Sequence, residues 1–296
     1  MAKFYITPPI YYVNAPPHLG HAYADVLADA LARYHRLLGE EVFFLTGTDE
    51  HGANVVRAAA HSGQEISLFV KGNRELFKKL AKSLLLSNDD FIFTSDEKRH
   101  WPAAQALWKK LAASGDIYKG IYKGLYCLGH EAFITEKDLE NGKCRDHGEA
   151  PQLLEEENYF FRLSKYTEEI KKRINSGEFQ ILPAGRKNEI LSLLDEGLKD
   201  VSFSRPAKDI AWGVPVPGDH TQTMYVWCDA LSNYLSALGY GSNDESQFLR
   251  FWPADAHIIG KEILRFHAAF WPAMLLSAGL PLPKTILVHG LIQVGG

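Results

Sequence analysis

The chain has 296 residues, of which 46% are hydrophobic and 23% are charged, as in an ordinary globular protein. Because this length exceeds what one hydrophobic core usually supports, we expect a large domain and a smaller one. The net charge of −4 excludes a broadly basic surface, and three cysteines are too few for a disulfide framework and favour the cytosol. The N-terminus has no separate signal region, and no apolar run approaches the roughly 18 residues of a membrane span, so we expect neither secretion nor membrane insertion.

The first fifty residues predict a strand, a helix and a second strand. Residues 4–7 are β-prone and are followed by two prolines, and the continuous apolar run 41–47 is typical of a strand buried on both faces of a parallel sheet. Between them, apolar residues recur at helical spacing and Gly39 follows as a C-cap. The apolar face expected for this helix consists of Leu19, Tyr23, Val26, Leu27, Ala30, Leu31, Tyr34 and Leu38. A right-handed crossover would place the prolines and residues 46–49 at one carboxyl edge, where such sheets bind ligands.

The remaining sequence changes its pattern twice. The expected elements are helices at 65–86, 99–114 and 187–198, strands leading into helices at 224–238 and 256–275, and a strand at 285–294. From residue 115 to residue 219 short β-like pieces replace the alternation of strands and helices. We therefore predict an α/β fold with a Rossmann-like parallel sheet, encoded by residues 1–114 and 220–296 and split by an inserted domain at 115–219.

Two cysteine–histidine pairs lie close together in the predicted insertion. Each pair has two intervening residues, and thirteen residues separate the pairs. Two thiolates and two imidazoles are the four ligands of a tetrahedral structural Zn²⁺ site, and Gly142 in the interval can turn the chain back. The alternative is two buried cysteines and two solvent-exposed histidines without a metal. The predicted ligands, in a knuckle at about 125–150, are Cys127, His130, Cys144 and His147.

Several segments resemble those of one known family. HLGH at 18–21 is similar to the HIGH signature of class I aminoacyl-tRNA synthetases, which related nucleotidyltransferases share. The segments that narrow the resemblance are ITPPIYYVNAPPHLGH, FLTGTDEHG, the knuckle followed by ENYFFRLSKY, SFSRP, WGVPVPGD, YVWCDALSNY, IIGKEILRFHAAFWPAML and LVHGLIQVGG. Together they make essentially the whole chain resemble the methionyl-tRNA synthetases of bacterial type.

This resemblance implies a catalytic Rossmann domain split by a connective-peptide insertion with a zinc knuckle. It also implies a reaction in which L-methionine and ATP, used with Mg²⁺, form methionyl-adenylate and pyrophosphate. Methionine then passes to the 3′ end of the initiator and elongator methionine tRNAs. The methionine carboxylate is the nucleophile, so the enzyme supplies orientation and charge stabilisation. The family's second signature, a KMSKS-type lysine loop, is expected just after LIQVGG, and the resemblance therefore predicts a catalytic fragment with reduced activity.

The resemblance assigns the ATP end of the site to the start of the first helix. A helix N-terminus attracts phosphate, and His18 and His21 lie three residues apart on one helical face, where they can donate to phosphate oxygens. Gly20 would allow the nucleotide to approach the backbone closely. The alternative is that the two histidines only cap the helix. Further candidates for ATP binding are Gly260, Lys261, His289 and Gly290, and Lys261 is also a candidate catalytic residue.

The resemblance also implies a methionine pocket. Asp49, at the end of a predicted strand, should bind the substrate ammonium; the alternative is that it is the N-cap of a following helix. The side-chain pocket should consist of Ile10, Tyr12, Trp227, Ala230, Leu231, Tyr234 and His267. Sulfur against aromatic edges contributes about 0.3–1.5 kcal/mol per contact, which favours a thioether over a branched aliphatic side chain. Without the resemblance, each of these aromatics would be more typical of a core.

Two residues depart from the family pattern, and two other functions compete. His130 stands where the family commonly has cysteine, which would make metal binding more sensitive to acid. Cys228 stands where bulkier apolar residues are usual. One competitor is a class I synthetase for another aliphatic amino acid, although residues 115–219 leave too little room for the large editing insertion of those enzymes. The other is a non-catalytic module that binds methionine, adenylate or tRNA.

Overall fold

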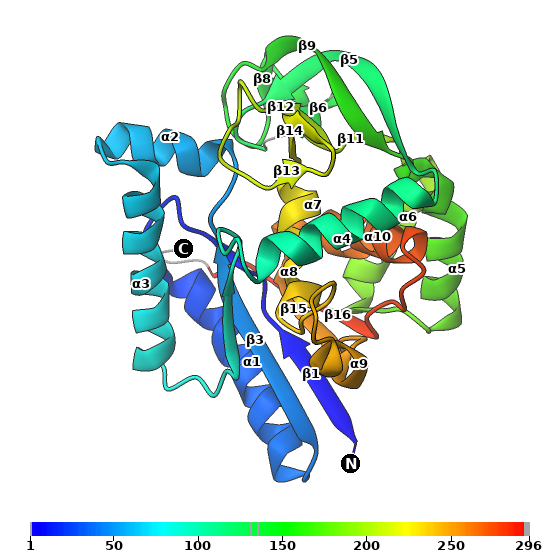
Figure 1. Ribbon diagram of the computed structural model, residues 1–296. Coiled ribbons are helices and arrows are strands. Elements are labelled where there is room, and N and C mark those ends of the chain that lie inside the picture. Colours follow the sequence, from blue (N-terminus) through cyan, green and yellow to red (C-terminus); the bar gives the residue numbers. More distant parts are fainter. Residues whose placement is uncertain (1, 131, 135, 293–296) are drawn as a thin grey trace.

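The computed structural model describes residues 2–130, 132–134 and 136–292, and a seven-stranded sheet forms its centre (Figure 1). The strands follow the order β10-β16-β15-β1-β3-β2, and β4 also pairs with β3. Within the described residues, each of these pairings is parallel. The strands are β1 (Lys3–Thr7), β2 (Tyr11–Tyr12), β3 (Glu41–Asp49), β4 (Asp90–Phe93), β10 (Gln180–Leu182), β15 (Ala256–Gly260) and β16 (Thr285–His289). The predicted α/β class with a Rossmann-like parallel sheet is confirmed.

Helices cover the sheet and extend to both sides of it (Figure 1). They are α1 (Leu19–Leu37), α2 (Ala53–Ser62), α3 (Ile66–Ser83), α4 (His100–Ala113), α5 (Thr167–Ser176), α6 (Ala184–Glu196), α7 (Val226–Leu231), α8 (Asn233–Ser236), α9 (Ser246–Phe251) and α10 (Trp271–Ser277). Short 3₁₀ turns occur at Glu136–Asp138, Leu163–Tyr166 and Lys261–Ile263, and a π-helical turn at Phe266–Phe270 precedes α10. In the part of the chain that is described, no helix has both the length and the apolar character needed to cross a membrane.

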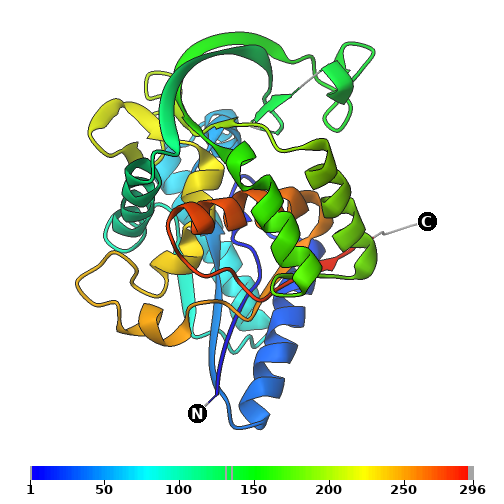
Figure 2. The same cartoon turned by 90° about the vertical axis from the view of Figure 1, so that its right-hand side faces the viewer.

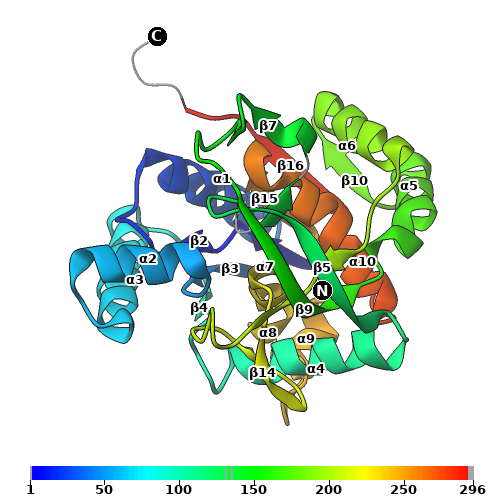
Figure 3. The ribbon, with the colours of Figure 1, turned by 90° about the horizontal axis from the view of Figure 1, so that it is seen from above.

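Antiparallel strands form a separate layer above the carboxyl edge of the main sheet (Figures 2 and 3). A four-stranded sheet consists of β5 (Ile117–Cys127), β6 (Ala132–Ile134), β9 (Gln152–Phe161) and β11 (Val201–Ser202). A three-stranded sheet consists of β12 (Ser204–Pro206), β13 (Pro215–Val216) and β14 (Asp219–Met224), and β7 (Leu139–Glu140) pairs with β8 (Lys143–Cys144). These strands lie in the range of the predicted insertion except β14, which begins at the last residue of that range and continues to Met224. That range also contains β10, which pairs with β16 in the main sheet.

Helix α1 turns a different face to the sheet from the predicted one. Its buried residues are Ala22, Ala24, Asp25, Ala28, Asp29 and Ala32. Most of the predicted face is exposed instead, including Leu19, Tyr23, Val26, Tyr34 and Leu38. Ala28 and Ala32 form a small core cluster with Ile6 and Phe44, because short side chains allow the helix to lie close to the strands. Leu27 and Leu31 of the predicted face pack against this cluster, and the rest of the prediction was wrong because it used hydropathy and ignored side-chain volume. Gly39 does follow the helix end, at φ +79°.

Three further elements differ from the predictions. Residues 226–231 form helix α7, and the strand before them, β14, pairs antiparallel with β12 and β13 outside the main sheet. Strand β16 ends at His289, five residues before the predicted end, and residues 293 and 294 lie outside the described residues. Helix α2 has no counterpart among the predicted elements.

Candidate active site

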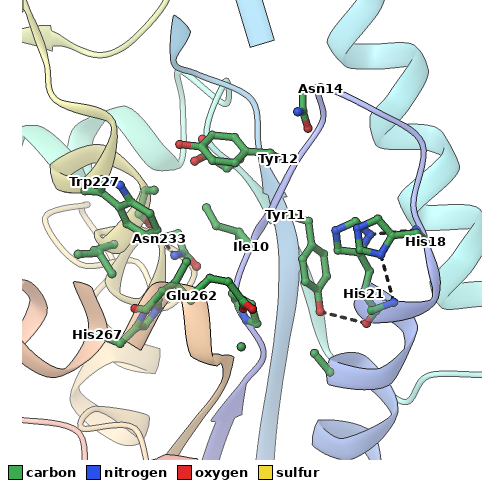
Figure 4. A pocket seen from close by; sticks show the side chains of 18 of the residues that line it. Ile10, Tyr11, Tyr12, Asn14, His18, His21, Trp227, Asn233, Glu262 and His267 are labelled. Atoms are coloured by element: carbon green, nitrogen blue, oxygen red, sulfur yellow. Dashed lines mark hydrogen bonds between the residues drawn. The ribbon is translucent and has the colours of Figure 1, made fainter. Parts of the chain in front are cut away.

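A cavity of about 450 Å³ opens at the carboxyl edge of the parallel sheet (Figure 4). Residues at or just after the ends of four strands line it: Ile10 after β1, Asp49 at the end of β3, Gly260 at the end of β15 and His289 at the end of β16. The start of α1 closes one side, and α7 and α8 close the other. A cavity at this edge is where open α/β sheets usually bind their ligands.

The cavity brings together most of the residues predicted for the ATP and methionine sites. Those that line it are Ile10, Tyr12, His18, Gly20, His21, Asp49, Trp227, Ala230, Leu231, Tyr234, Gly260, His267 and His289. Lys261 and Gly290 are exposed and do not line it. Lys261 begins the 3₁₀ turn after β15, and the next two residues, Glu262 and Ile263, face the cavity in its place.

His18 and His21 cap helix α1 and line the cavity at the same time. The backbone N–H of Gly20 donates to His18 Nδ1 at 3.1 Å, and the backbone N–H of His18 donates to His21 Nδ1 at 3.0 Å. The two rings stack with their centroids 3.7 Å apart. Since both Nδ1 atoms accept, each neutral ring carries its hydrogen on Nε2. Both histidines therefore cap the helix, and each ring keeps an Nε2–H donor for a ligand.

The space that a side chain at position 20 would need is already filled. A Cβ on Gly20 would come within 3.0 Å of the His18 ring. Gly20 thus allows the stacked histidine pair to fold over the helix start. Burial and the neighbouring His18 lower the pKa of His21 to about 4, so its ring is neutral at physiological pH.

Tyr11 packs against His21 and hydrogen-bonds to a buried acid, Asp25. The Tyr11 ring lies 4.7 Å from the His21 ring, and its hydroxyl donates to Asp25 Oδ1 at 3.1 Å. The hydroxyl of Thr46 donates to the same oxygen at 3.1 Å. Burial raises the pKa of Asp25 to about 7, although both hydrogen bonds act in the opposite direction. Nothing in the sequence pattern distinguishes this acid from a solvent-facing one, because it falls outside the predicted apolar face.

Asp49 presents a buried carboxylate at the end of β3. Its Oδ1 accepts from the backbone N–H of His51 and from the hydroxyl of Thr94, each at 3.3 Å. The following helix, α2, has Gly52 as its N-cap. The alternative interpretation of Asp49 as a helix N-cap is therefore wrong.

The opposite wall of the cavity is aromatic (Figure 4). Trp227 stacks on Phe266 with centroids 3.7 Å apart. The hydroxyl of Tyr234 donates to His267 Nε2 at 2.8 Å, because the Nδ1–H of that ring donates to the Ile263 carbonyl at 3.0 Å. Burial lowers the pKa of His267 to about 4, which keeps the ring neutral. The wall is thus apolar and uncharged, with a few fixed polar groups.

Sequence reasoning missed four polar or aromatic residues of the cavity: Tyr11, Asn14, Asn233 and Glu262. Asn233 is 1% exposed, and its Nδ2 donates to the Ala230 carbonyl at 2.6 Å. All four belong to segments that carry the family resemblance. The signal that could have found them is their position within two residues of predicted site residues.

The cysteine–histidine cluster fits a tetrahedral metal site. The ligand atoms of Cys127, His130, Cys144 and His147 all lie within 4.8 Å of one another. Cys144 Sγ is 3.5 Å from Nδ1 of both His130 and His147, and Cys127 Sγ is 3.7 Å from His147 Nδ1. Bonds of about 2.3 Å to sulfur and about 2.0 Å to nitrogen place tetrahedral ligands about 3.5 Å apart. Asp146 Oδ2 lies 3.0 Å from His130 Nε2, which assigns Nδ1 of that ring to the metal side.

The chain matches one family model and several known proteins. Residues 4–139 and 134–296 match the family model described as tRNA synthetases class I (M). The chain is 50% identical to the methionine–tRNA ligase of Thermotoga maritima over 298 residues, which cover 99% of this chain and 47% of that protein. It is 47% identical to the methionine–tRNA ligase of Brucella suis over 294 residues, which cover 98% of this chain and 56% of that protein. The chain spans about half the length of the curated relatives it matches.

Solved structures of one relative match the fold closely. Mycobacterium tuberculosis methionyl-tRNA synthetase in complex with methionyl-adenylate superposes with a TM-score of 0.93 at 43% identity, covering 98% of this chain and 57% of that chain. The apo form of the same protein gives a TM-score of 0.83 at 41% identity, covering 98% of this chain and 56% of that chain. The family model and these likenesses extend over almost the whole chain. The chain therefore belongs to the class I tRNA synthetases, in the family designated M.

Proposed function

We propose that this chain activates L-methionine with ATP, used with Mg²⁺, to form methionyl-adenylate and pyrophosphate. We further propose that it transfers methionine to the 3′ end of methionine tRNAs, initiator and elongator, in the cytoplasm. The observation that carries the proposal is one cavity whose two ends suit a phosphate and an amino acid. The phosphate end is the capped start of α1, and the amino-acid end combines the Asp49 carboxylate with an aromatic wall. The names of the relatives support this assignment.

The cavity can hold the two substrates in line for reaction. We propose that the Asp49 carboxylate binds the methionine ammonium and that the thioether lies against Trp227, Tyr234 and His267. The methionine carboxylate then attacks the α-phosphorus of ATP, a carboxyl O–P bond forms, and the P–O bond to the leaving pyrophosphate breaks. His18 and His21 would donate from Nε2–H to the phosphate oxygens as negative charge develops there. Such donors need no reorganisation, because capping already fixes both rings.

The remaining residues divide between the two substrates. For methionine we propose Ile10, Tyr12, Ala230 and Leu231 as the apolar surround of the side chain. For ATP we propose Gly20, Gly260 and His289, together with Glu262, whose carboxylate can accept from ribose hydroxyls. A Cβ on Gly260 would lie 2.8 Å from Glu262 Oε2, so the glycine makes room for that carboxylate. Lys261 and Gly290 do not line the cavity, and we leave them out of the proposed site.

We also propose that Cys127, His130, Cys144 and His147 hold one structural Zn²⁺. Such an ion cross-links the hairpin and takes no part in the chemistry. The division of the chain into residues 1–114, 115–219 and 220–296 is likewise a proposal. It is supported by the antiparallel sheets, most of whose strands lie in the middle range. Two strands depart from it: β14 continues into the third range, and β10 pairs in the main sheet.

Amino-acid-dependent exchange of pyrophosphate into ATP tests the proposed function. We expect exchange with L-methionine and none with leucine, isoleucine or valine. Binding of L-methionine and of a non-hydrolysable methionyl-adenylate analogue, measured by calorimetry, separates activation from recognition. Exchange driven by leucine instead of methionine would overturn the proposed specificity. Binding of both ligands without any exchange would support the competing non-catalytic binding module.

A further inference from the structure

Asp229 is a buried charge on the helix that carries the aromatic wall. It lies in α7 between the cavity residues Trp227 and Ala230 and is 1% exposed. His51 Nδ1 donates to its Oδ2 at 2.6 Å, and His100 Nε2 donates to its Oδ1 at 2.6 Å. Burial alone would raise the pKa of Asp229, but the two histidines outweigh burial and lower the pKa to about 2. The carboxylate is therefore ionised, and each oxygen has one imidazole partner.

One of these partners, His51, also contacts Asp49 at the other end of the proposed amino-acid pocket. The side chain of His51 binds Asp229, and the backbone N–H of the same residue donates to Asp49 Oδ1 at 3.3 Å. A single residue thus joins the aromatic helix to the carboxylate proposed for the substrate ammonium. His51 is 2% exposed, so water does not compete for either bond.

The second partner reaches Asp49 by a longer route. His100 is the first residue of α4, and the indole N–H of the next residue, Trp101, donates to the Thr94 carbonyl at 3.1 Å. The Thr94 hydroxyl in turn donates to Asp49 Oδ1 at 3.3 Å. Both oxygens of Asp229 are therefore connected, through different segments, to the same oxygen of Asp49.

We propose that Asp229 is a positioning residue that sets the separation between the thioether wall and the ammonium-binding carboxylate of the methionine pocket. This inference rests on the proposed function. A bound methionine must place its ammonium on the carboxylate and its thioether on the aromatic wall at the same time, so the spacing of these two groups affects binding. In catalysis, a misplacement of about 1 Å can cost on the order of 100-fold in rate. His18 and His21, at the phosphate end, take no part in the contacts described for Asp229. Substitution of Asp229 should therefore weaken the binding of methionine and leave the binding of ATP unchanged.

A purely structural role for Asp229 predicts a different result. Loss of an internal ion pair would lower stability and leave the affinity for methionine unchanged wherever the protein is still folded. A positioning role predicts weaker methionine binding in fully folded protein. It also predicts that a substitute for His51 with an N–H near the former Nδ1 restores binding.

The test measures binding of L-methionine and, separately, of ATP with Mg²⁺ to the whole chain by calorimetry. The variants are Asp229→Asn, His51→Phe, which keeps a ring without a donor, and His51→Asn, which keeps a donor near Nδ1. The control, Asp195→Asn, removes an ion pair with Lys171, and neither of these residues lines the cavity. Circular dichroism selects the variants that remain folded, and the two His51 variants provide the test if Asp229→Asn does not fold.

We expect Asp229→Asn and His51→Phe to weaken methionine binding about 10- to 100-fold, with ATP binding within about twofold of the parent. His51→Asn should recover most of that loss, and Asp195→Asn should bind both ligands as the parent does. If the His51→Phe variant is folded and binds methionine as the parent does, this inference is overturned while the proposed function stands. Failure of the parent chain to bind methionine would overturn the proposed function instead.

Discussion

His18 and His21 each use Nδ1 to accept a backbone hydrogen bond at the start of α1, which leaves Nε2–H of both rings available to a ligand. Sequence reasoning treats capping and phosphate binding as alternatives because it considers a histidine as one group. An imidazole has two nitrogens, and here one stabilises the helix start while the other serves the cavity. Loss of either ring would therefore remove a cap worth about 1 kcal/mol together with a proposed phosphate donor.

The buried acid beneath these histidines predicts a pH dependence of stability. Burial raises the pKa of Asp25 to about 7, from 3.8 in the absence of such burial. Between these pH values the folded state holds a proton that the unfolded state has lost, so Asp25 contributes less stability as the pH rises, up to about pH 7. Asp25→Asn removes this titration. Relative to the parent, its free energy of unfolding should increase by on the order of a few kcal/mol from pH 4.5 to pH 8, measured by urea denaturation.

Asp29, one helical turn further along α1, provides a control of opposite sign. Burial acts to raise the pKa of Asp29, but hydrogen bonds from Ser87 and Arg33 outweigh it and lower the pKa. Its ionised form is therefore favoured in the folded state, and its contribution to stability is lost as the pH falls through the acid range. Asp29→Asn should become more destabilising as the pH rises from acid to neutral. Parallel pH profiles for the two variants would contradict the assignment of a neutral Asp25 below pH 7.

At the scale of elements, strand β3 has a glycine, Gly47, where it pairs with Ile92 of β4, and a larger residue would not fit there. A Cβ on Gly47 would lie 2.1 Å from the Ile92 carbonyl oxygen and 3.0 Å from Cγ2 of Ile10 in the cavity wall. Because backbone atoms cannot move aside as a flexible side chain can, Gly47→Ala should destabilise the protein by about 3 kcal/mol or more. Its displacement of Ile10 should also weaken methionine binding. Thermal unfolding and calorimetry measure the two effects.

The same substitution in helix α3 should have the reverse effect on stability. Gly72 is exposed in the helix interior, and a Cβ there would meet no atom of the described residues within 4 Å. Alanine is favoured over glycine in a helix by about 0.8–1.0 kcal/mol, so Gly72→Ala should raise the free energy of unfolding by up to that amount. Equal effects of the two substitutions would refute the packing argument for Gly47.

Element types were easier to predict than faces and boundaries. The apolar run of β3 is long enough to be recognised as a buried strand, and the structure extends it to Asp49. Helix α1 was recognised from its period, but most of its predicted apolar face is exposed because Ala28 and Ala32 are the residues that fit against the sheet. Residues 224–238 were predicted to run from a strand into a helix, and helix α7 already begins at Val226. Tertiary packing decides such cases, and hydropathy does not contain that information.

At the scale of the whole molecule, the cavity draws on segments that are far apart in the sequence. Parallel strands brought Asp49 and the prolines after β1 to one edge, as the βαβ pattern predicted. The aromatic wall comes from α7, α8 and the turn before α10, and only the family resemblance indicated it. The choice between Lys261 and Glu262 could not be made from sequence, because it depends on the phase of a three-residue 3₁₀ turn.

The cysteine–histidine hairpin is connected to the catalytic half through helix α2. Arg57 donates to the Leu128 carbonyl at 3.0 Å, and Asn54 donates to the Gly129 carbonyl at 3.4 Å. Both carbonyls lie between the proposed ligands Cys127 and His130, and α2 begins just after the segment that contains Asp49 and His51. A metal that orders this turn should therefore also order the first turn of α2.

Removal of the metal tests this connection without reference to activity. Protein purified without chelator should contain one Zn²⁺ per chain by elemental analysis, and chelation should increase amide hydrogen exchange both in the hairpin and at the start of α2. In Arg57→Ala the metal should remain bound, because Arg57 is not a ligand. Amide exchange at the start of α2 should already be faster in this variant than in the parent, and chelation should change it little. Absence of stoichiometric zinc would refute the metal site, and an unchanged α2 in the chelated parent would refute its connection to the catalytic half.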